Sequence, residues 1–181
     1  YPDVPGTHQF FGNCAAVDNP LQAPRPASVV VVGLGPEGAL RTSELTYTVR
    51  MGVLALAQRL VERSEGSESR FELAATLIGS GGAGISVGQA AQAIAQGVRE
   101  ADLALAELNA RLQAQRPPGR AWPRVGQLSF VELYLNRASE AWSALQQQAE
   151  SSPGQYALAD AVRSGTGALR RPMDGGYRGS H

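Results

Sequence analysis

Hydrophobic and polar positions along the chain change period several times, which predicts strands alternating with helices. Three short apolar runs are typical of strands: Ser28–Val32, Phe71–Ile78 and Val125–Leu135. The first is apolar and β-branched along its length, the pattern of a strand buried on both faces. We expect Tyr156–Val162 to form a further, short strand.

Longer segments between these runs place apolar residues at the 3.6-residue spacing of an amphipathic helix. One begins at Thr42 or Ser43, either of which can cap it. A second follows Ser86, and Gln89 three residues later predicts a capping box. A third is expected over Arg137–Glu150, with Asn136 as its cap.

Strands joined by helical crossovers predict an α/β fold, and specifically a three-layer α/β/α sandwich around a mainly parallel or mixed sheet. We expect residues 28–171 to form a single domain. Residues 1–27, rich in Pro, Gly and Asn, are interpreted as an irregular entry arm, and residues 172–181 as a tail. The chain starts at Tyr1 rather than Met, which suggests a piece of a longer polypeptide.

Composition excludes several functions. The chain has 181 residues, 43% hydrophobic and 18% charged, typical of a globular domain. All 16 basic residues are Arg, balanced by 16 acidic residues without a basic run, so nucleic acid is not an expected partner. The absence of Lys excludes Schiff-base chemistry and a P-loop lysine. No membrane-spanning run and no signal peptide are recognised, and we expect a cytoplasmic protein.

Two glycine-rich loops follow apolar strands and are the strongest indications of a ligand. Residues 33–38 and 79–84 both match the G-x-G-x-x-G spacing. The second loop leads into a helix N-terminus, where free N–H groups and the helix dipole favour a phosphate or carboxylate. The predicted ligand-binding residues are Gly79, Ser80, Gly81, Gly82, Ala83, Gly84, Ile85, Ser86, Gly33 and Gly35. Alternatively, the glycines serve only a tight turn and close helix packing.

Candidate catalytic groups are few. Glu37 beside the first loop is a possible general base or a solvated carboxylate, and His8 with Cys14 lacks the third group that would orient a nucleophile. Glu132 and Arg137 lie where the third strand becomes a helix, and are interpreted as pocket residues or, for Arg137 with Glu140, as a helix-surface pair. No catalytic residue, metal site or cofactor is predicted.

Two family resemblances accompany these motifs. The segment 73–98, containing IGSGGAGISVGQAAQAI, resembles the diphosphate loop of macro domains, which bind ADP-ribose and related nucleotides. That resemblance implies a macro-like fold with Ser80–Ile85 as the diphosphate loop. The catalytic Asn-rich loop is missing, as is an Asp for adenine. The start VVVVGLG is similar to the macro-like, non-catalytic N-terminal domain of leucine aminopeptidases.

A second resemblance covers more of the chain. YPDVPGT, VVVVGLGPEGAL, VGQLSFVELYLNRASEAW and GALRRP, with the second glycine loop and its helix, resemble an accessory region of bacterial CHAT-domain proteins. Those proteins carry a caspase-like protease domain, whose His and Cys motifs are not recognisable here. The resemblance implies a companion module, with any protease activity in another domain of the parent chain.

Three hypotheses follow from the sequence. The first is a non-catalytic regulatory module that senses a phosphorylated small molecule or nucleotide and influences other domains of its parent chain. The second is a hydrolase of an ADP-ribose or phosphoester substrate, with Glu37 or Glu132 positioning water. The third is a purely structural or protein-interaction domain.

Overall fold

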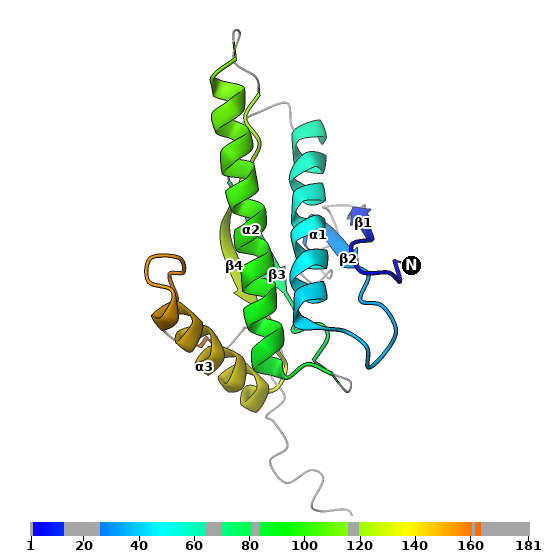
Figure 1. Cartoon of the computed structure of the whole chain (residues 1–181), viewed down its shortest axis with the longest axis vertical. Helices are drawn as coiled ribbons and strands as arrows, with labels where there is room; N and C mark the ends of the chain where they lie inside the picture. The colour runs from blue at the N-terminus through cyan, green and yellow to red at the C-terminus, as the bar shows by residue number, and fades with distance from the viewer. Residues whose placement is uncertain are drawn as a thin grey trace, which may run out of the picture.

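The computed structural model describes residues 2–12, 26–63, 70–80, 84–115, 120–160 and 162–163. Its elements follow the chain in the order β1 (His8–Gly12), β2 (Ser28–Val32), α1 (Thr42–Arg63), β3 (Arg70–Ala75), α2 (Val87–Gln113), β4 (Arg124–Phe130) and α3 (Leu135–Ser151). Figure 1 shows the two long helices, α1 and α2, lying beside each other with both N-termini at the same end. The coarse α/β prediction is therefore confirmed.

The strands pair differently from the single sheet that the sequence predicted. In the described part of the chain they form two separate two-stranded sheets, β1 with β2 and β3 with β4. The first pair is antiparallel, with His8 opposite Val32, and only the second is parallel. Because β1 lies within residues 1–27, the interpretation of that segment as wholly irregular was wrong. β1 has only five residues, too few for an alternation of apolar and polar positions to predict a strand.

Two predicted strands end earlier than their apolar runs. β3 stops at Ala75 and β4 at Phe130, after which Val131 N–H donates to the Ala75 carbonyl at 2.9 Å. The apolar residues beyond these points continue into loops, so hydrophobicity alone overestimated the strands. Residues 156–160 and 162 do not form the short strand expected there.

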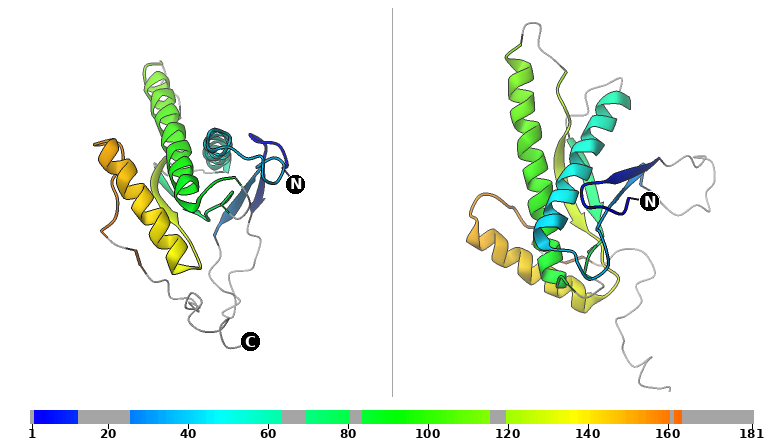
Figure 2. Two further views of the ribbon diagram at one scale, coloured as in Figure 1. Left: turned by 60° about the horizontal axis from the view of Figure 1, so that its bottom comes forward. Right: turned by 45° about the vertical axis from the view of Figure 1, so that its right-hand side comes forward.

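The main core lies between α1, α2 and one face of β3–β4. Phe71, Leu73 and Ala75 of β3 pack on buried residues of the helices, whereas the alternate positions of β3 are exposed. Among the described residues, β3 is thus covered on one side. The two views of Figure 2 show α3 packed across the N-terminal half of α2. A second small cluster joins these two helices around Ala141 and Ala91.

Close helix contact between α1 and α2 depends on a glycine. A Cβ atom at Gly97 would lie only 2.6 Å from the Thr46 carbonyl oxygen. Nearby, the Thr46 hydroxyl donates to the Ala93 carbonyl at 3.2 Å. The small residues of α2 therefore set the helix separation, which in turn fixes the positions of both helix N-termini.

The start of β4 is tied to α2 by an ion pair. Asp102 accepts hydrogen bonds from Arg124 Nε at 3.1 Å and from the Val125 N–H at 3.0 Å, and a further bond from Arg124 Nη2. The hydrogen bond to Asp102 raises the pKa of Arg124 above its ordinary value, against the opposing effect of burial. This pair fixes the start of β4 against the second half of α2, away from the glycine loop.

Candidate functional site

The second glycine loop connects β3 to α2, and its described ends are constrained by the core. Gly79 has a φ of 81°, and a Cβ there would lie 2.6 Å from Leu40 Cδ2. Gly84 has a φ of 153°, and Ile85 is 5% exposed in the main core. Both glycines thus serve the turn itself. The predicted ligand residues Gly81, Gly82 and Ala83 lie outside the described residues.

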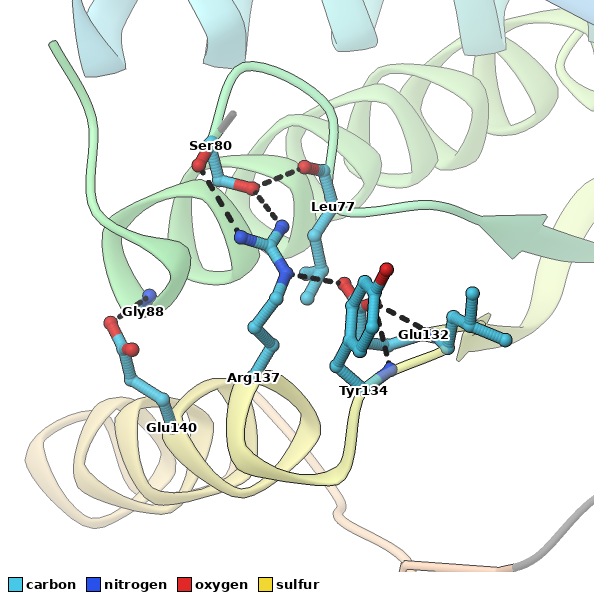
Figure 3. Close-up of polar contacts among 8 residues, drawn as sticks. Leu77, Ser80, Gly88, Glu132, Tyr134, Arg137 and Glu140 are labelled. Carbon is cyan, nitrogen blue, oxygen red and sulfur yellow. Dashed lines mark hydrogen bonds and ion pairs between the residues drawn. The ribbon is translucent and has the colours of Figure 1, made fainter. Parts of the chain in front are cut away.

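A chain of polar contacts joins this loop to α3 and to the link before it (Figure 3). Arg137 Nη2 donates to the Ser80 hydroxyl at 2.6 Å, and Arg137 Nη1 lies 3.5 Å from the Ser80 carbonyl oxygen. The Ser80 hydroxyl donates to the Leu77 carbonyl at 2.5 Å. Arg137 Nε donates to a Glu132 carboxylate oxygen at 3.0 Å. The fold therefore places a guanidinium group directly on the candidate loop.

Glu132 accepts two backbone hydrogen bonds just before α3 begins. Its Oε1 accepts hydrogen bonds from the Leu133 N–H at 2.7 Å and the Tyr134 N–H at 3.1 Å. Burial alone raises the pKa of Glu132. The bonds from Arg137, Tyr134 and Leu133, with the Arg137 charge, outweigh burial and hold that pKa below its usual value. The N-cap residue Tyr134 has no capping side-chain bond, so the prediction of Asn136 as cap was wrong.

The N-terminus of α2 is capped as the sequence predicted. Ser86 Oγ accepts from the Gln89 N–H, and the Gln89 side chain accepts from the Ser86 N–H, which completes the capping box. In addition, Glu140 of α3 accepts a hydrogen bond from the Gly88 N–H at 3.2 Å. A Cβ at Gly88 would lie 2.9 Å from Ala144 Cβ, so this approach of α3 requires a glycine.

This carboxylate changes the interpretation of the helix N-terminus. The end of α2 at which we expected an external anion already holds an internal one, Glu140. Arg137 and Glu140 also do not form the surface pair considered from the sequence: each contacts a different part of the loop and helix opposite. Sequence spacing missed Glu140 because its partner lies 52 residues away.

The first glycine loop lies against the N-terminal segment. The Gly33 N–H donates to the Thr7 carbonyl at 2.9 Å, and the Gly35 N–H to the Asp3 carbonyl at 2.7 Å. A Cβ at Gly33 would lie 2.2 Å from the Val4 carbonyl oxygen. These two predicted binding residues therefore use their N–H groups within the fold. The glycine at 33 allows the close approach of the Val4 backbone, and the glycine at 35 allows a φ of 79°.

The remaining candidates do not gather at the loop. Glu37 is exposed in a turn, and His8 stacks edge-on with Phe10 in the β1 region. Cys14 lies outside the described residues. Within the described ranges, no group of three or more His, Cys, Asp or Glu side chains could hold a metal ion, and no helix has the length and apolar character needed to cross a membrane.

Comparison of the chain with models of protein families, with curated proteins and with solved structures gives no match.

Proposed function

We propose that this protein is a non-catalytic ligand-sensing module that takes the anionic group of a phosphorylated small molecule at the loop formed by residues 79–86. The observation that supports this function is the position of Arg137, whose guanidinium group donates to the Ser80 hydroxyl beside the N-terminus of α2. A guanidinium fork next to a helix N-terminus and serine hydroxyls is a chemically suitable environment for a phosphate group.

The two internal carboxylates explain how such a module would report its ligand. Glu132 accepts a hydrogen bond from Arg137, and Glu140 accepts one from the Gly88 N–H. Each carboxylate therefore supplies negative charge where the ligand would. A bound phosphate competes with Glu140 for the start of α2, and its binding would weaken the attachment of α3. Movement of α3 is then the signal that reaches a neighbouring domain.

The ligand class and setting follow from the resemblances. The resemblance to macro domains favours ADP-ribose or a nucleotide, and a three-layer sandwich, macro-domain-like, is the complete fold we propose. The resemblance to CHAT-associated regions favours a bacterial, cytoplasmic parent protein whose other domains receive the signal. The hydrolase alternative gains no support from Glu132, because a carboxylate with three donors and a lowered pKa is a poor proton acceptor.

Thermal unfolding with added ligands tests the proposal. The panel contains ADP-ribose, NAD, ATP, cyclic dinucleotides and inorganic phosphate. A ligand at about 100 times its dissociation constant adds about 2.7 kcal/mol of stability, or about 5–11 °C at this chain length. No shift with any of these ligands would refute the proposal.

Three variants locate the site. Arg137→Gln is expected to reduce the ligand-induced shift strongly, whereas Arg111→Gln, at a side chain 80% exposed on α2, leaves it unchanged. Glu140→Gln is expected to tighten binding, since it removes the competing charge while the protein itself becomes less stable. Equal shifts in Arg137→Gln and in the wild type would place the ligand elsewhere.

A further inference from the structure

A groove separate from the glycine loop lies between the N-terminal halves of α1 and α2. It has a volume of about 590 Å³, within the range of small-molecule sites. Its walls are mainly hydroxyl and amide groups, including Ser43 and Tyr47 on α1 and Gln89 and Gln96 on α2. Such a lining is suited to a polar ligand rather than an apolar one.

Arg50 of α1 is the cation of this groove, and its charge is not used by the fold. In the parts of the chain that are described, its guanidinium group has no hydrogen bond and no ion pair. Its Nε atom is covered from solvent and has no acceptor. Buried donors without partners are rare in proteins, and Arg137 and Arg124 both have carboxylate partners. Among the described residues, Arg50 is therefore a cation without an anionic partner.

The acidic side chain in the groove lining does not pair with Arg50. Glu100, the carboxylate in the lining, already accepts a hydrogen bond from the Gln96 amide at 2.9 Å and makes no ion pair with Arg50.

We propose that this groove is a second binding site, for a small polar molecule that presents a carboxylate or phosphate group to Arg50. The guanidinium group binds the oxyanion, and the hydroxyl and amide groups of the walls bind the polar remainder. The site does not depend on the glycine loop: its cation is on α1, whereas Arg137 is on α3.

NMR of the ¹⁵N-labelled full chain tests this directly, because the Arg50 Nε–H group gives its own resonance. Sodium phosphate and sodium succinate are titrated separately at constant ionic strength against sodium chloride. A saturable shift of the Arg50 Nε–H and Gln96 side-chain amide resonances with one of them is the expected result, and the salt that produces it distinguishes phosphate from carboxylate. No saturable shift at these resonances with either salt overturns the proposal.

Variants separate this site from the loop. Arg50→Gln is expected to weaken binding at least about tenfold, and Arg111→Gln to leave it unchanged. Ser43→Asp serves as a variant that keeps the fold, since an acidic residue is favourable in the first turn of a helix, and its charge is expected to repel the anion. Binding that survives both Arg50→Gln and Ser43→Asp, or shifts confined to the Ser80 and Arg137 resonances, refutes the groove site. Arg137→Gln, which removes the loop site, is expected to leave the ligand-induced shifts of the groove resonances unchanged.

Discussion

Replacing Glu132 tests whether one carboxylate both fixes the backbone before α3 and holds Arg137 against the glycine loop. Glu132→Ala removes the acceptor of two backbone N–H groups and the ionic partner of Arg137 together. Glu132→Gln keeps an oxygen for the N–H groups and removes only the charge. Comparing the two variants therefore separates the stability contributed by the backbone hydrogen bonds from that contributed by the ion pair.

The size of the effect follows from the contacts. Loss of the two hydrogen bonds from the Leu133 and Tyr134 N–H groups, both in exposed residues, costs about 1 kcal/mol. The Glu132–Arg137 pair has side chains only 12% and 28% exposed, and its loss costs about 1 kcal/mol more. We expect Glu132→Ala to lower the free energy of unfolding by about 2 kcal/mol at pH 7, a decrease in Tm of about 4–8 °C. Glu132→Gln is expected to lose about half of this.

The difference between wild type and variant depends on pH with a definite sign. The pKa of Glu132 is lower in the folded protein than the ordinary value of 4.5. Its stabilising charge is therefore fully present above pH 4.5 and is lost as the pH falls through the folded-state pKa. The stability gap between wild type and Glu132→Gln is expected to close in acid.

Urea unfolding followed by circular dichroism, from about pH 7 down to about pH 2, measures this gap. Glu107→Gln is the matched control, because Glu107 is 74% exposed and pairs with Arg111 at 4.0 Å, so its removal costs less than about 0.5 kcal/mol. A gap for Glu132→Gln that is constant with pH, or no larger than that of the control at pH 7, would refute the reasoning.

Three further stability changes are expected, each measurable by the same unfolding assay. Gly97→Ala forces a Cβ to within 2.6 Å of the Thr46 carbonyl and is expected to cost about 1–2 kcal/mol despite the better helix propensity of Ala; a more stable variant would contradict the packing. Asp102→Asn weakens the tie to Arg124 by about 1–2 kcal/mol, and high salt is expected to narrow that difference. Thr48→Val leaves one backbone N–H and one carbonyl without their buried partner and is expected to cost about 2 kcal/mol; an unchanged Tm would argue against both bonds.

Local features of the chain were predictable where a residue acts on its near neighbours. The helix expected after Thr42 or Ser43 and the capping box of Ser86 with Gln89 depend on spacings of three or four residues, and both elements are present. The helix already begins at Thr42, however, so the prediction of Thr42 or Ser43 as its cap was wrong. The strand Ser28–Val32 was also predicted with its correct bounds, but its expected burial on both faces was wrong, because Val29 is 46% exposed. The start of α3 was not, because the helix begins without a side-chain cap, and Glu132, held by Arg137, bonds to the backbone N–H groups that precede it.

Pairings between distant residues needed the tertiary structure. Apolar strands specify burial but not their partner, so the sequence did not show that β2 pairs with β1 or that one face of β3 stays exposed. The glycine loop was visible as a pattern. That Glu140 occupies the helix N-terminus beyond it follows from the packing of α3 on α2.

The sequence by itself determined the alternation of helices and strands, the cap of α2 and the position of the glycine loop, since these depend on local spacing and backbone freedom. The tertiary structure decided which charges meet. It places Arg137 within hydrogen-bond distance of Ser80, and Glu140 within hydrogen-bond distance of the Gly88 N–H. It leaves Arg50 without a partner among the described residues. The interaction between two charged groups depends on their separation in space, and that separation cannot be read from the order of residues along the chain.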